Sequence, residues 1–353
     1  MKKVIIAYTQ LNEFGGIEYL FVQLAKFLKK RKTKLTIVCF EDKINFSKYE
    51  KNIEVIKLSN RQNILKRAKN LKETIDEINH EGLPLFYDLK SIAYAKLANI
   101  KNYNIALTDP PSLLRQYEPK ARGYKRFRFI TKNYIFEKII KGGVENAKKV
   151  IVMNKRNAKE YKSIYKIKPK IIYPGIYGHF NKEGVTPKPL VYKKELNLIS
   201  VCRLAKSKNL DWILFGIKYL LKKNKENKYF KNINLKMIGS GPELKTLKKV
   251  SKEMNISKNT QFYGFISESK KNRLFSNSHI NLIPAVSAYN LPALESLRLG
   301  VPVVINEKCR MNEILKNNQM VKITKNNKFS FSKDLYKYTE DLKNKKISNY
   351  KLS

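Results

Sequence analysis

Four stretches in the second half of the chain decide the fold, and each runs from a short apolar segment through a turn into an amphipathic one. They read VCRLAKSKNLD (residues 201–211), MIGSGPEL (237–244), QFYGFIS (261–267) and IPAVSAYNLPALESLRLGVPVV (283–304). Short β-branched runs that alternate with helical periodicity are typical of βα units around a parallel sheet. The same alternation begins at residues 4–8, so the sequence predicts an α/β fold.

The length of 353 residues favours two domains, because single cores rarely grow beyond about 250–300 residues. Residues 181–194 contain Gly184, Pro187 and Pro189, interrupt the alternation and are predicted to form a linker. We therefore expect an N-terminal domain over 1–180 and a C-terminal domain over 195–330. A last helix near 331–343, within 331–353, is expected to return to the first domain.

Strands are expected at short apolar runs and helices at segments with helical spacing of apolar residues. In the first domain we predict strands near 4–8, 35–40, 53–57, 83–87, 103–107, 150–153 and 170–173, and a helix at 17–30. In the second domain we predict strands near 196–201, 235–238, 260–263, 280–284 and 302–305, and helices at 209–221 and 243–254.

Composition limits the classes of protein. The formal net charge is +44, yet only 12 of the 73 basic residues are Arg, the residue on which base-reading proteins depend most. Two explanations of the excess of lysine stay open, a compositional bias of the proteome and attraction to an anionic membrane surface. Specific nucleic-acid recognition is disfavoured. Three cysteines far apart indicate no disulfide framework or zinc site. We expect a cytoplasmic protein, either free or attached peripherally to the inner face of the cell membrane.

In this order and spacing, the four stretches resemble the nucleotide-binding half of family-4-type retaining glycosyltransferases, the glycosyl transferases group 1. FGGIEYLFVQLAKFL (14–28) and YPGIYGHF (173–180) are similar to N-terminal parts of the same family. The resemblance implies the GT-B fold, in which two Rossmann-like doubly wound domains face each other across a cleft. It also implies a metal-independent hexosyltransferase that retains anomeric configuration, with a UDP or GDP sugar as donor and no other cofactor. The acceptor would be a hydroxyl of a glycan, or of a lipid-linked or protein-linked acceptor.

Arg203 and Lys208 are the candidate catalytic cations. Transfer of a sugar releases a nucleoside diphosphate, and fixed positive charge stabilises that leaving group. The two residues stand five apart across a strand-to-helix turn, so both can point at one anion. The resemblance assigns them this role; the alternative is that both are solvated surface charges.

Two glycine pairs follow strands. Gly15 and Gly16 let backbone amides approach a phosphate or sugar at a helix N-terminus, and Glu18 completes the Gly-Gly-x-Glu pattern of the family. Gly239 and Gly241 lie in a second strand-to-helix turn of this kind. A tight turn without ligand contact is the alternative for the first pair, and a purely structural role is the alternative for the second.

Glu295 is the candidate ribose ligand, since a carboxylate can accept hydrogen bonds from two hydroxyls. The resemblance assigns it this role. The family has a second glutamate eight positions earlier in the chain, where Ser287 stands here, so the backbone of residues 289–291 must grip the transferred sugar. That departure implies a different sugar or reduced activity. The full expected donor site comprises Gly15, Gly16, Gly239, Gly241, Phe265, Ser287, Tyr289, Asn290, Leu291 and Glu295.

Asp109 is a further candidate for the acceptor side of the reaction. It stands in LTDPPSLL (107–114), where the family often places a histidine, and it could orient the acceptor hydroxyl or accept its proton. Capping of a helix that begins at the two prolines explains it equally well. The three histidines form no metal or triad pattern. No Asp-x-Asp motif occurs, so we expect no metal site.

Residues 115–143 interleave cations with aromatic side chains. Such a stretch can lie in an anionic membrane interface, stack single-stranded nucleic acid, or pack its aromatic residues into the first domain.

Two rival functions of the protein stay open. One is a nucleic-acid-modifying glycosyltransferase, favoured only by charge; the other is a degenerate, non-catalytic nucleotide-sugar-binding protein, favoured by Ser287 and the missing histidine.

Overall fold

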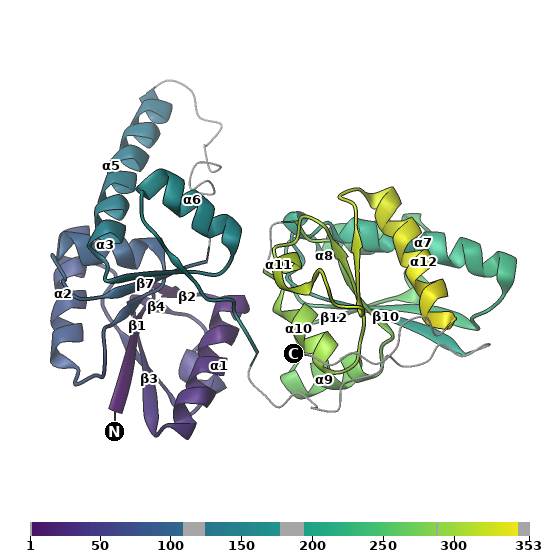
Figure 1. The fold of residues 1–353 in the computed structure, drawn as a ribbon, viewed down its shortest axis with the longest axis horizontal. Helices are drawn as coiled ribbons and strands as arrows, with labels where there is room; N and C mark the ends of the chain where they lie inside the picture. Colours follow the sequence, from purple (N-terminus) through teal and green to yellow (C-terminus); the bar gives the residue numbers. More distant parts are fainter. Residues whose placement is uncertain (1, 109–123, 177–193, 287–288, 345–353) are drawn as a thin grey trace. The chain divides into compact units, whose positions relative to one another are not determined.

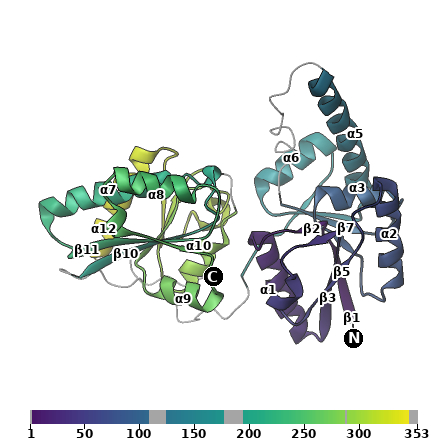
Figure 2. The same cartoon turned by 180° about the vertical axis from the view of Figure 1, so that it is seen from behind.

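The computed structural model describes residues 2–108, 124–176, 194–286 and 289–344, with the backbone alone for 124–132. The chain divides into two compact units, Met1–Tyr177 and Gly178–Ser353. Each unit contains its own twisted parallel sheet with helices on both faces, seen from opposite sides in Figures 1 and 2. The predicted α/β class is therefore confirmed.

The first unit is built on a seven-stranded sheet in the order β5-β3-β1-β6-β7-β8-β9, and β2 and β4 form a separate small pair. Its strands are β1 (Lys2–Ala7), β2 (Gln10–Leu11), β3 (Thr33–Cys39), β4 (Glu41–Asp42), β5 (Ile53–Lys57), β6 (Leu85–Phe86), β7 (Asn104–Leu107), β8 (Lys149–Val152) and β9 (Lys170–Ile171). Its helices are α1 (Gly16–Lys30), α2 (Ile64–Glu77), α3 (Leu89–Leu97), α5 (Tyr124–Asn146) and α6 (Lys155–Tyr165), with a 3₁₀ turn at Phe46–Tyr49.

The apolar runs of this unit feed two hydrophobic cores, one on each face of the sheet. Successive side chains of a strand point to opposite faces, so Ile5 joins the core formed with α2, α3, α5 and α6, whereas Ile6 joins the core formed with α1. Because both faces are buried, the strands are continuous apolar runs rather than alternating ones.

The second unit is built on a six-stranded sheet in the order β12-β11-β10-β13-β14-β15. Its strands are β10 (Glu195–Val201), β11 (Asn232–Ile238), β12 (Thr260–Gly264), β13 (Ile280–Ile283), β14 (Val303–Asn306) and β15 (Val321–Thr324). Its helices are α7 (Leu210–Asn227), α8 (Leu244–Glu253), α9 (Glu268–Ser276), α10 (Leu291–Arg298), α11 (Asn312–Leu315) and α12 (Lys328–Lys343), with 3₁₀ turns at Lys206–Lys208 and Ser257–Asn259.

The C-terminal helix lies in the second unit. Helix α12 packs beside α7 there. Its apolar face makes the contact, since Phe331 and Leu335 are fully buried in the core shared with α7. The expected return of residues 331–353 to the first domain stays a prediction. Gly216 of α7 faces Leu335, and a Cβ atom there would come within 3.2 Å of the leucine side chain. The small residue lets the two helices approach closely.

The predicted strands and helices are confirmed, most of them within a few residues at their ends, and α7 runs on to Asn227. The two-residue strands β2 and β4 were not predicted. Strand β15 (Val321–Thr324) was not predicted, because four residues at the edge of the sheet carry too little periodicity. The linker (residues 181–194) lies outside the described residues, apart from Lys194.

Truncation of Leu335 tests the placement of α12. Leu335→Ala should lower the free energy of unfolding by about 2–5 kcal/mol, because it leaves a cavity in a fully buried contact. Urea denaturation measures the change. The matched control is Phe329→Ala in the first turn of the same helix, where the side chain is 63% exposed and the expected cost is at most about 0.5 kcal/mol. Equal costs for the two variants would contradict the packing of α12 on α7.

Candidate functional site

The second unit has its topological switch point between β10 and β13. From β10 the chain moves outward through β11 to β12, then returns to β13 on the opposite side of β10. The loops that follow β10 and β13 therefore lead away from each other, and ligands of open parallel sheets bind in the crevice that such loops leave. Arg203 and Lys208 follow β10, and residues 284–295 follow β13. The topology thus places the expected donor residues on both sides of the switch point.

The loop that carries Arg203 is pinned to the loop after β11. The backbone N–H of Leu204 donates to the carbonyl of Ser240 at 2.8 Å, and the N–H of Glu243 donates to the carbonyl of Leu204 at 3.0 Å. Leu204 is buried between them, whereas the adjacent Arg203 is exposed. The backbone at the strand end is therefore fixed, and the Arg203 side chain that it carries is exposed.

Gly239 and Gly241 make this contact possible. Their φ angles are +128° and +156°, and an added Cβ atom would lie 1.9 Å from the carbonyl oxygen of Cys202 and 2.3 Å from that of Leu204. No side chain fits in either place. Both glycines therefore have a structural task, which is to let the 239–241 backbone lie against the Arg203 loop. Direct contact with a donor stays a prediction for them.

Lys208 is half-buried at the end of the same turn, in the 3₁₀ segment Lys206–Lys208. Its positive charge lowers the pKa of two nearby thiols. Burial raises the pKa of Cys202, after β10, to about 11, and the nearby Lys208 ammonium opposes that shift. Burial likewise raises the pKa of Cys309, after β14, to about 11, and Lys208 again opposes it. Lys208 therefore lies within electrostatic reach of two strand ends on both sides of the switch point.

Asn209 joins the two sides of the switch point directly. It stands at the N-terminus of α7 with φ of +50°, and its side chain does not cap the helix. Instead its Nδ2 donates to the carbonyl of Pro284, at the end of β13, at 3.2 Å. Asn306, at the end of β14, donates to the same carbonyl at 3.1 Å. The N-terminus of α7 and the ends of β13 and β14 are thus joined at one carbonyl oxygen.

Glu295 lies on α10 and is only 2% exposed. Its Oε1 accepts a hydrogen bond from the Nζ of Lys271 on α9 at 2.8 Å, and Lys271 also contacts Glu268 at 2.9 Å. The second oxygen of Glu295, Oε2, is buried and has no hydrogen-bond partner among the described residues. The carboxylate is therefore held at one oxygen, and its other oxygen is buried without a hydrogen bond among the described residues.

Sequence reasoning missed Lys271. The signal was present, because Lys271 stands three and four positions before Leu274 and Phe275 and thus on the apolar face of α9. A cation at such a position needs a buried partner.

The segment before Glu295 is only partly described. Ser287 lies outside the described residues, so its expected role at the transferred sugar stays a prediction. Tyr289 packs at the edge of the α10 core, and Asn290 and Leu291 are each 6% exposed at the start of the helix. Phe265, which follows β12, is 61% exposed. These residues lie at carboxyl ends of strands, the edge that the topology selects.

In the first unit, Gly15 and Gly16 follow β1 at the switch point between β1 and β6. The N–H of Gly15 donates to Oε2 of Glu18 at 2.9 Å, and the hydroxyl of Tyr8 donates to Oε1 of Glu18 at 3.3 Å. Burial raises the pKa of the Glu18 carboxyl. Glu18 thus closes the first turn of α1. A Cβ atom added at Gly16 would have no other atom within 4 Å, so there is free space beside this glycine. The donor role of the two glycines stays a prediction.

On the other side of this switch point stands Asp88, which the sequence analysis did not single out. Its carboxylate accepts hydrogen bonds from the N–H of Thr9 at 2.5 Å and from the N–H of Ser91 at 2.8 Å, and so caps α3. Burial raises its pKa. Both oxygens are occupied by the fold, so Asp88 is a structural residue. Asp109 lies outside the described residues.

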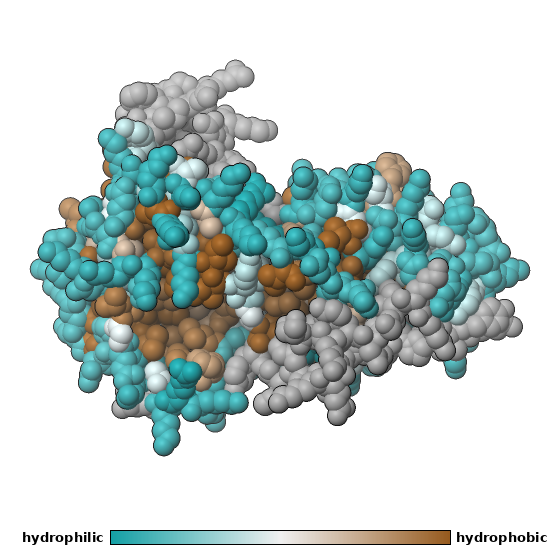
Figure 3. Space-filling view, viewed as in Figure 1, coloured by the Kyte–Doolittle hydropathy of each residue, from teal (hydrophilic) through white to brown (hydrophobic). Residues whose placement is uncertain are grey.

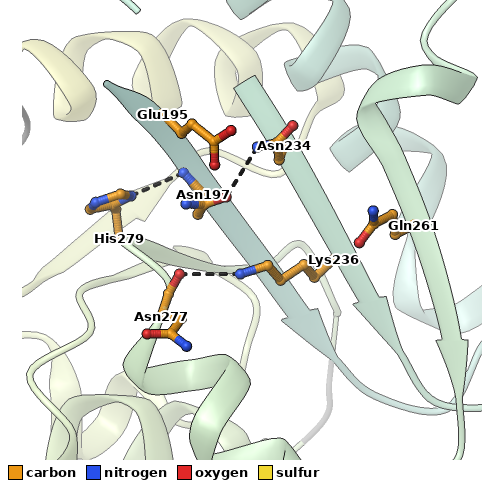
Figure 4. Close-up of a pocket in the computed structure, with 7 residues that line it drawn as sticks. All are labelled: Glu195, Asn197, Asn234, Lys236, Gln261, Asn277 and His279. Atoms are coloured by element: carbon orange, nitrogen blue, oxygen red, sulfur yellow. Dashed lines mark hydrogen bonds between the residues drawn. The ribbon is translucent and has the colours of Figure 1, made fainter. Parts of the chain in front are cut away.

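A polar pocket of about 580 Å³ lies at the opposite edge of the second sheet. Figure 4 shows side chains from β10, β11 and β12 together with Asn277 and His279 of the segment between α9 and β13, where His279 accepts a hydrogen bond from the N–H of Asn197. None of the expected site residues lines it. Its lining residues are Glu195, Asn197, Asn234, Lys236, Gln261, Asn277 and His279. Within the described part of the chain, no group of His, Cys, Asp and Glu side chains could hold a metal ion.

Substitution of Gly239 tests the packing of the Arg203 loop. Gly239→Ala should lower the free energy of unfolding by about 2–4 kcal/mol, because it adds a clash with the Cys202 carbonyl to an unfavourable φ angle. Chemical denaturation measures the loss. The control is Gly264→Ala, where φ is +66° and no atom lies within 4 Å of the added Cβ, so only the backbone term of about 1 kcal/mol is expected. A cost for Gly239→Ala no larger than the control's would refute the close approach of the two loops.

The second half of the chain is similar to known glycosyltransferases in sequence. The family model "Glycosyl transferases group 1" matches residues 181–351. An uncharacterized glycosyltransferase of Methanocaldococcus jannaschii is 23% identical over 128 residues, which are 36% of this chain and 31% of that protein. The aligned region thus spans about a third of that relative.

Solved structures resemble the whole chain. Anabaena HepE in complex with UDP and glucose has a TM-score of 0.72 at 15% identity, covering 99% of this chain and 92% of that one. Sucrose-phosphate synthase of Thermosynechococcus elongatus has a TM-score of 0.72 at 14% identity, covering 97% and 90%. At such identities the likeness establishes the fold, which is GT-B, as expected. The chain thus has the GT-B fold, and its second half matches the model of the glycosyl transferases group 1 family.

Proposed function

We propose that the protein transfers a hexose from a UDP or GDP sugar to a hydroxyl acceptor, with retention of the anomeric configuration. The observation that carries this proposal is the buried Glu295 carboxylate with one unpaired oxygen, at the same sheet edge as Arg203 and Lys208. A nucleoside diphosphate has the matching chemistry, with neutral ribose hydroxyls at one end and phosphate charge at the other.

In this proposal the two cations act on the leaving group. As the bond between the anomeric carbon and the phosphate oxygen breaks, negative charge develops on the diphosphate, and Arg203 and Lys208 stabilise it. The acceptor hydroxyl attacks from the face that the diphosphate leaves, and the departing phosphate oxygen is close enough there to take its proton. No protein nucleophile is needed, and the two positive side chains fill the role that a divalent metal has elsewhere.

The comparisons support a donor of this class and a glycan product. Anabaena HepE has solved structures with UDP and with UDP-glucose, and WaaG, another structural neighbour, is described as a glycosyltransferase involved in lipopolysaccharide biosynthesis. We therefore propose a glycan or a lipid-linked saccharide as the acceptor.

If the acceptor is lipid-linked, the protein is proposed to bind the anionic membrane surface that carries it. Tyr134 and Ile135 on α5 are 56% and 54% exposed, and the Lys138 ammonium lies 4.7 Å from the centroid of the Tyr134 ring. Exposed aromatic and apolar side chains beside cations suit a membrane interface. Hydrophobic side chains of the first unit also gather in a hollow on the face seen in Figure 3. None of the helices in the described residues has the length and apolar run that a membrane crossing requires.

Removal of either cation tests the donor site. Arg203→Ala and Lys208→Ala should each lower the rate of sugar transfer at least about a hundredfold, because each removes charge that the transition state needs most. Turnover of radiolabelled UDP-glucose, and of the GDP sugar where UDP-glucose is inert, measures the loss. The matched control is Lys206→Ala, an exposed lysine of the same 3₁₀ turn, which should keep full activity. Full activity in both Arg203→Ala and Lys208→Ala would refute the assignment.

Flotation with liposomes tests the membrane surface. The protein should float with vesicles that contain 30% phosphatidylglycerol, at about tenfold greater recovery than with neutral phosphatidylcholine vesicles, since anionic lipid attracts basic segments. Replacing both Tyr134 and Ile135 by Ser should reduce that recovery, whereas Phe27→Ser on α1, 41% exposed, should not. Equal recovery from neutral and anionic vesicles would argue against an electrostatic membrane site.

A further inference from the structure

The buried Lys271 has no role in the proposed function as stated so far, and its position is unusual. The side chain is 10% exposed and its Nζ lies 2.8 Å from Oε1 of Glu295, whose own side chain is 3% exposed. The third member, Glu268, is 52% exposed and lies 2.9 Å from the same Nζ. The cation therefore joins a carboxylate at the surface to a carboxylate in the interior.

Stability alone does not account for this pair. Removing two charges from water costs roughly as much as their attraction returns, and buried ion pairs can often be replaced by apolar residues without loss. What the pair does provide is a fixed geometry. Lys271 occupies Oε1, whereas Oε2 is buried and has no partner among the described residues. A buried carboxylate oxygen without a hydrogen bond is costly, so this oxygen is suited to accept from a ligand.

The helices that carry the pair are themselves fixed. Asn281 of β13, which is fully buried, donates to the Pro292 carbonyl and to the Ser296 hydroxyl of α10, each at 3.1 Å. On α9, Phe275 is fully buried against the sheet, four residues after Lys271. Neither helix can therefore shift easily to accommodate a loss of the ion pair, and the orientation of Glu295 depends on Lys271 itself.

We infer that Lys271 is a positioning residue, which holds Glu295 by one oxygen so that the other accepts the ribose hydroxyls of the donor. This inference rests on the proposed function, because it requires a nucleotide at the site. Its consequence is specificity. A preorganised acceptor binds a hydroxyl pair strongly and gains little from a nucleotide that lacks one of them. The enzyme should therefore prefer ribonucleotides over 2′-deoxyribonucleotides, and that preference should depend on Lys271.

The test compares UDP with 2′-deoxy-UDP on the full chain by titration calorimetry, with GDP and 2′-deoxy-GDP as the alternative pair. The unmodified protein should bind UDP about tenfold more tightly than 2′-deoxy-UDP, a difference of one lost hydrogen bond to a charged group. Lys271→Met should reduce this ratio of affinities to about two or less, mainly by weakening the binding of UDP. Lys271→Arg, which keeps a cation beside Glu295, should restore most of the ratio.

The matched control is Lys270→Met. Lys270 is the exposed neighbour on the same helix and lies over the Tyr263 ring, 5.8 Å from its centroid. This variant should leave the ratio unchanged. A lysine with a merely structural role would alter melting temperature in Lys271→Met but would leave the ratio of the two affinities as it was, and that result would overturn the inference.

A second comparison covers the case in which Lys271→Met does not fold, since it leaves a buried carboxylate without a counter-ion. Glu295→Gln removes that charge, so Glu295→Gln should be compared with Lys271→Met/Glu295→Gln. If Lys271 acts through Glu295, adding Lys271→Met to Glu295→Gln should not change the ratio further. An additional drop in the double variant would contradict that route.

The experiment separates failure of this inference from failure of the proposed function. If the unmodified protein binds neither UDP nor GDP, the donor site itself is wrong. If it binds one of them in a manner that requires Arg203 and Lys208, yet shows no preference over the 2′-deoxy form, the donor site stands and the positioning role of Lys271 is refuted.

Discussion

The proposed donor site of this protein depends on a close contact between two backbone segments. Cys202–Leu204, after β10, lies so near to Gly239–Gly241, after β11, that neither glycine leaves room for a Cβ atom. Hydrogen bonds in both directions hold the segments together. This contact fixes the place from which Arg203 projects and where the turn containing Lys208 begins. Without it the sheet would still form, but the two cations would stand on a free loop and lose the preorganisation on which electrostatic stabilisation depends.

A second constraint acts across the switch point, through side chains rather than backbone. Asn209 and Asn306 both donate to the carbonyl of Pro284, so the N-terminus of α7 and the ends of β13 and β14 are joined at one acceptor. Lys271 and Glu295 then tie α9 to α10 on the same side of the sheet edge. In each case a polar group that would be costly if left unpaired inside the protein holds a segment of the proposed donor site in place.

Much of the fold was predictable from the sequence, because βα units leave strong local patterns. All strands of the two large sheets except β15 were found from apolar runs, and the Gly-containing turns were found from glycine positions. What could not be predicted depends on contacts between distant segments. The packing of α12 on α7 was not predicted, because it depends on a small residue, Gly216, on the partner helix. Lys271 was missed because its buried neighbour, Glu295, is 24 positions away in sequence.

The three cysteines have a practical consequence. Burial raises the pKa of Cys39 to about 12 and that of Cys202 and of Cys309 to about 11. Thiolates are the reactive form, and at pH 7 fewer than about one in a thousand of these groups carry the charge. Maleimide and iodoacetamide reagents should therefore leave the native chain almost unlabelled. A single new cysteine on the surface of each unit could carry a fluorophore pair, and changes in the distance between the units could be followed in solution while the native residues stay in place.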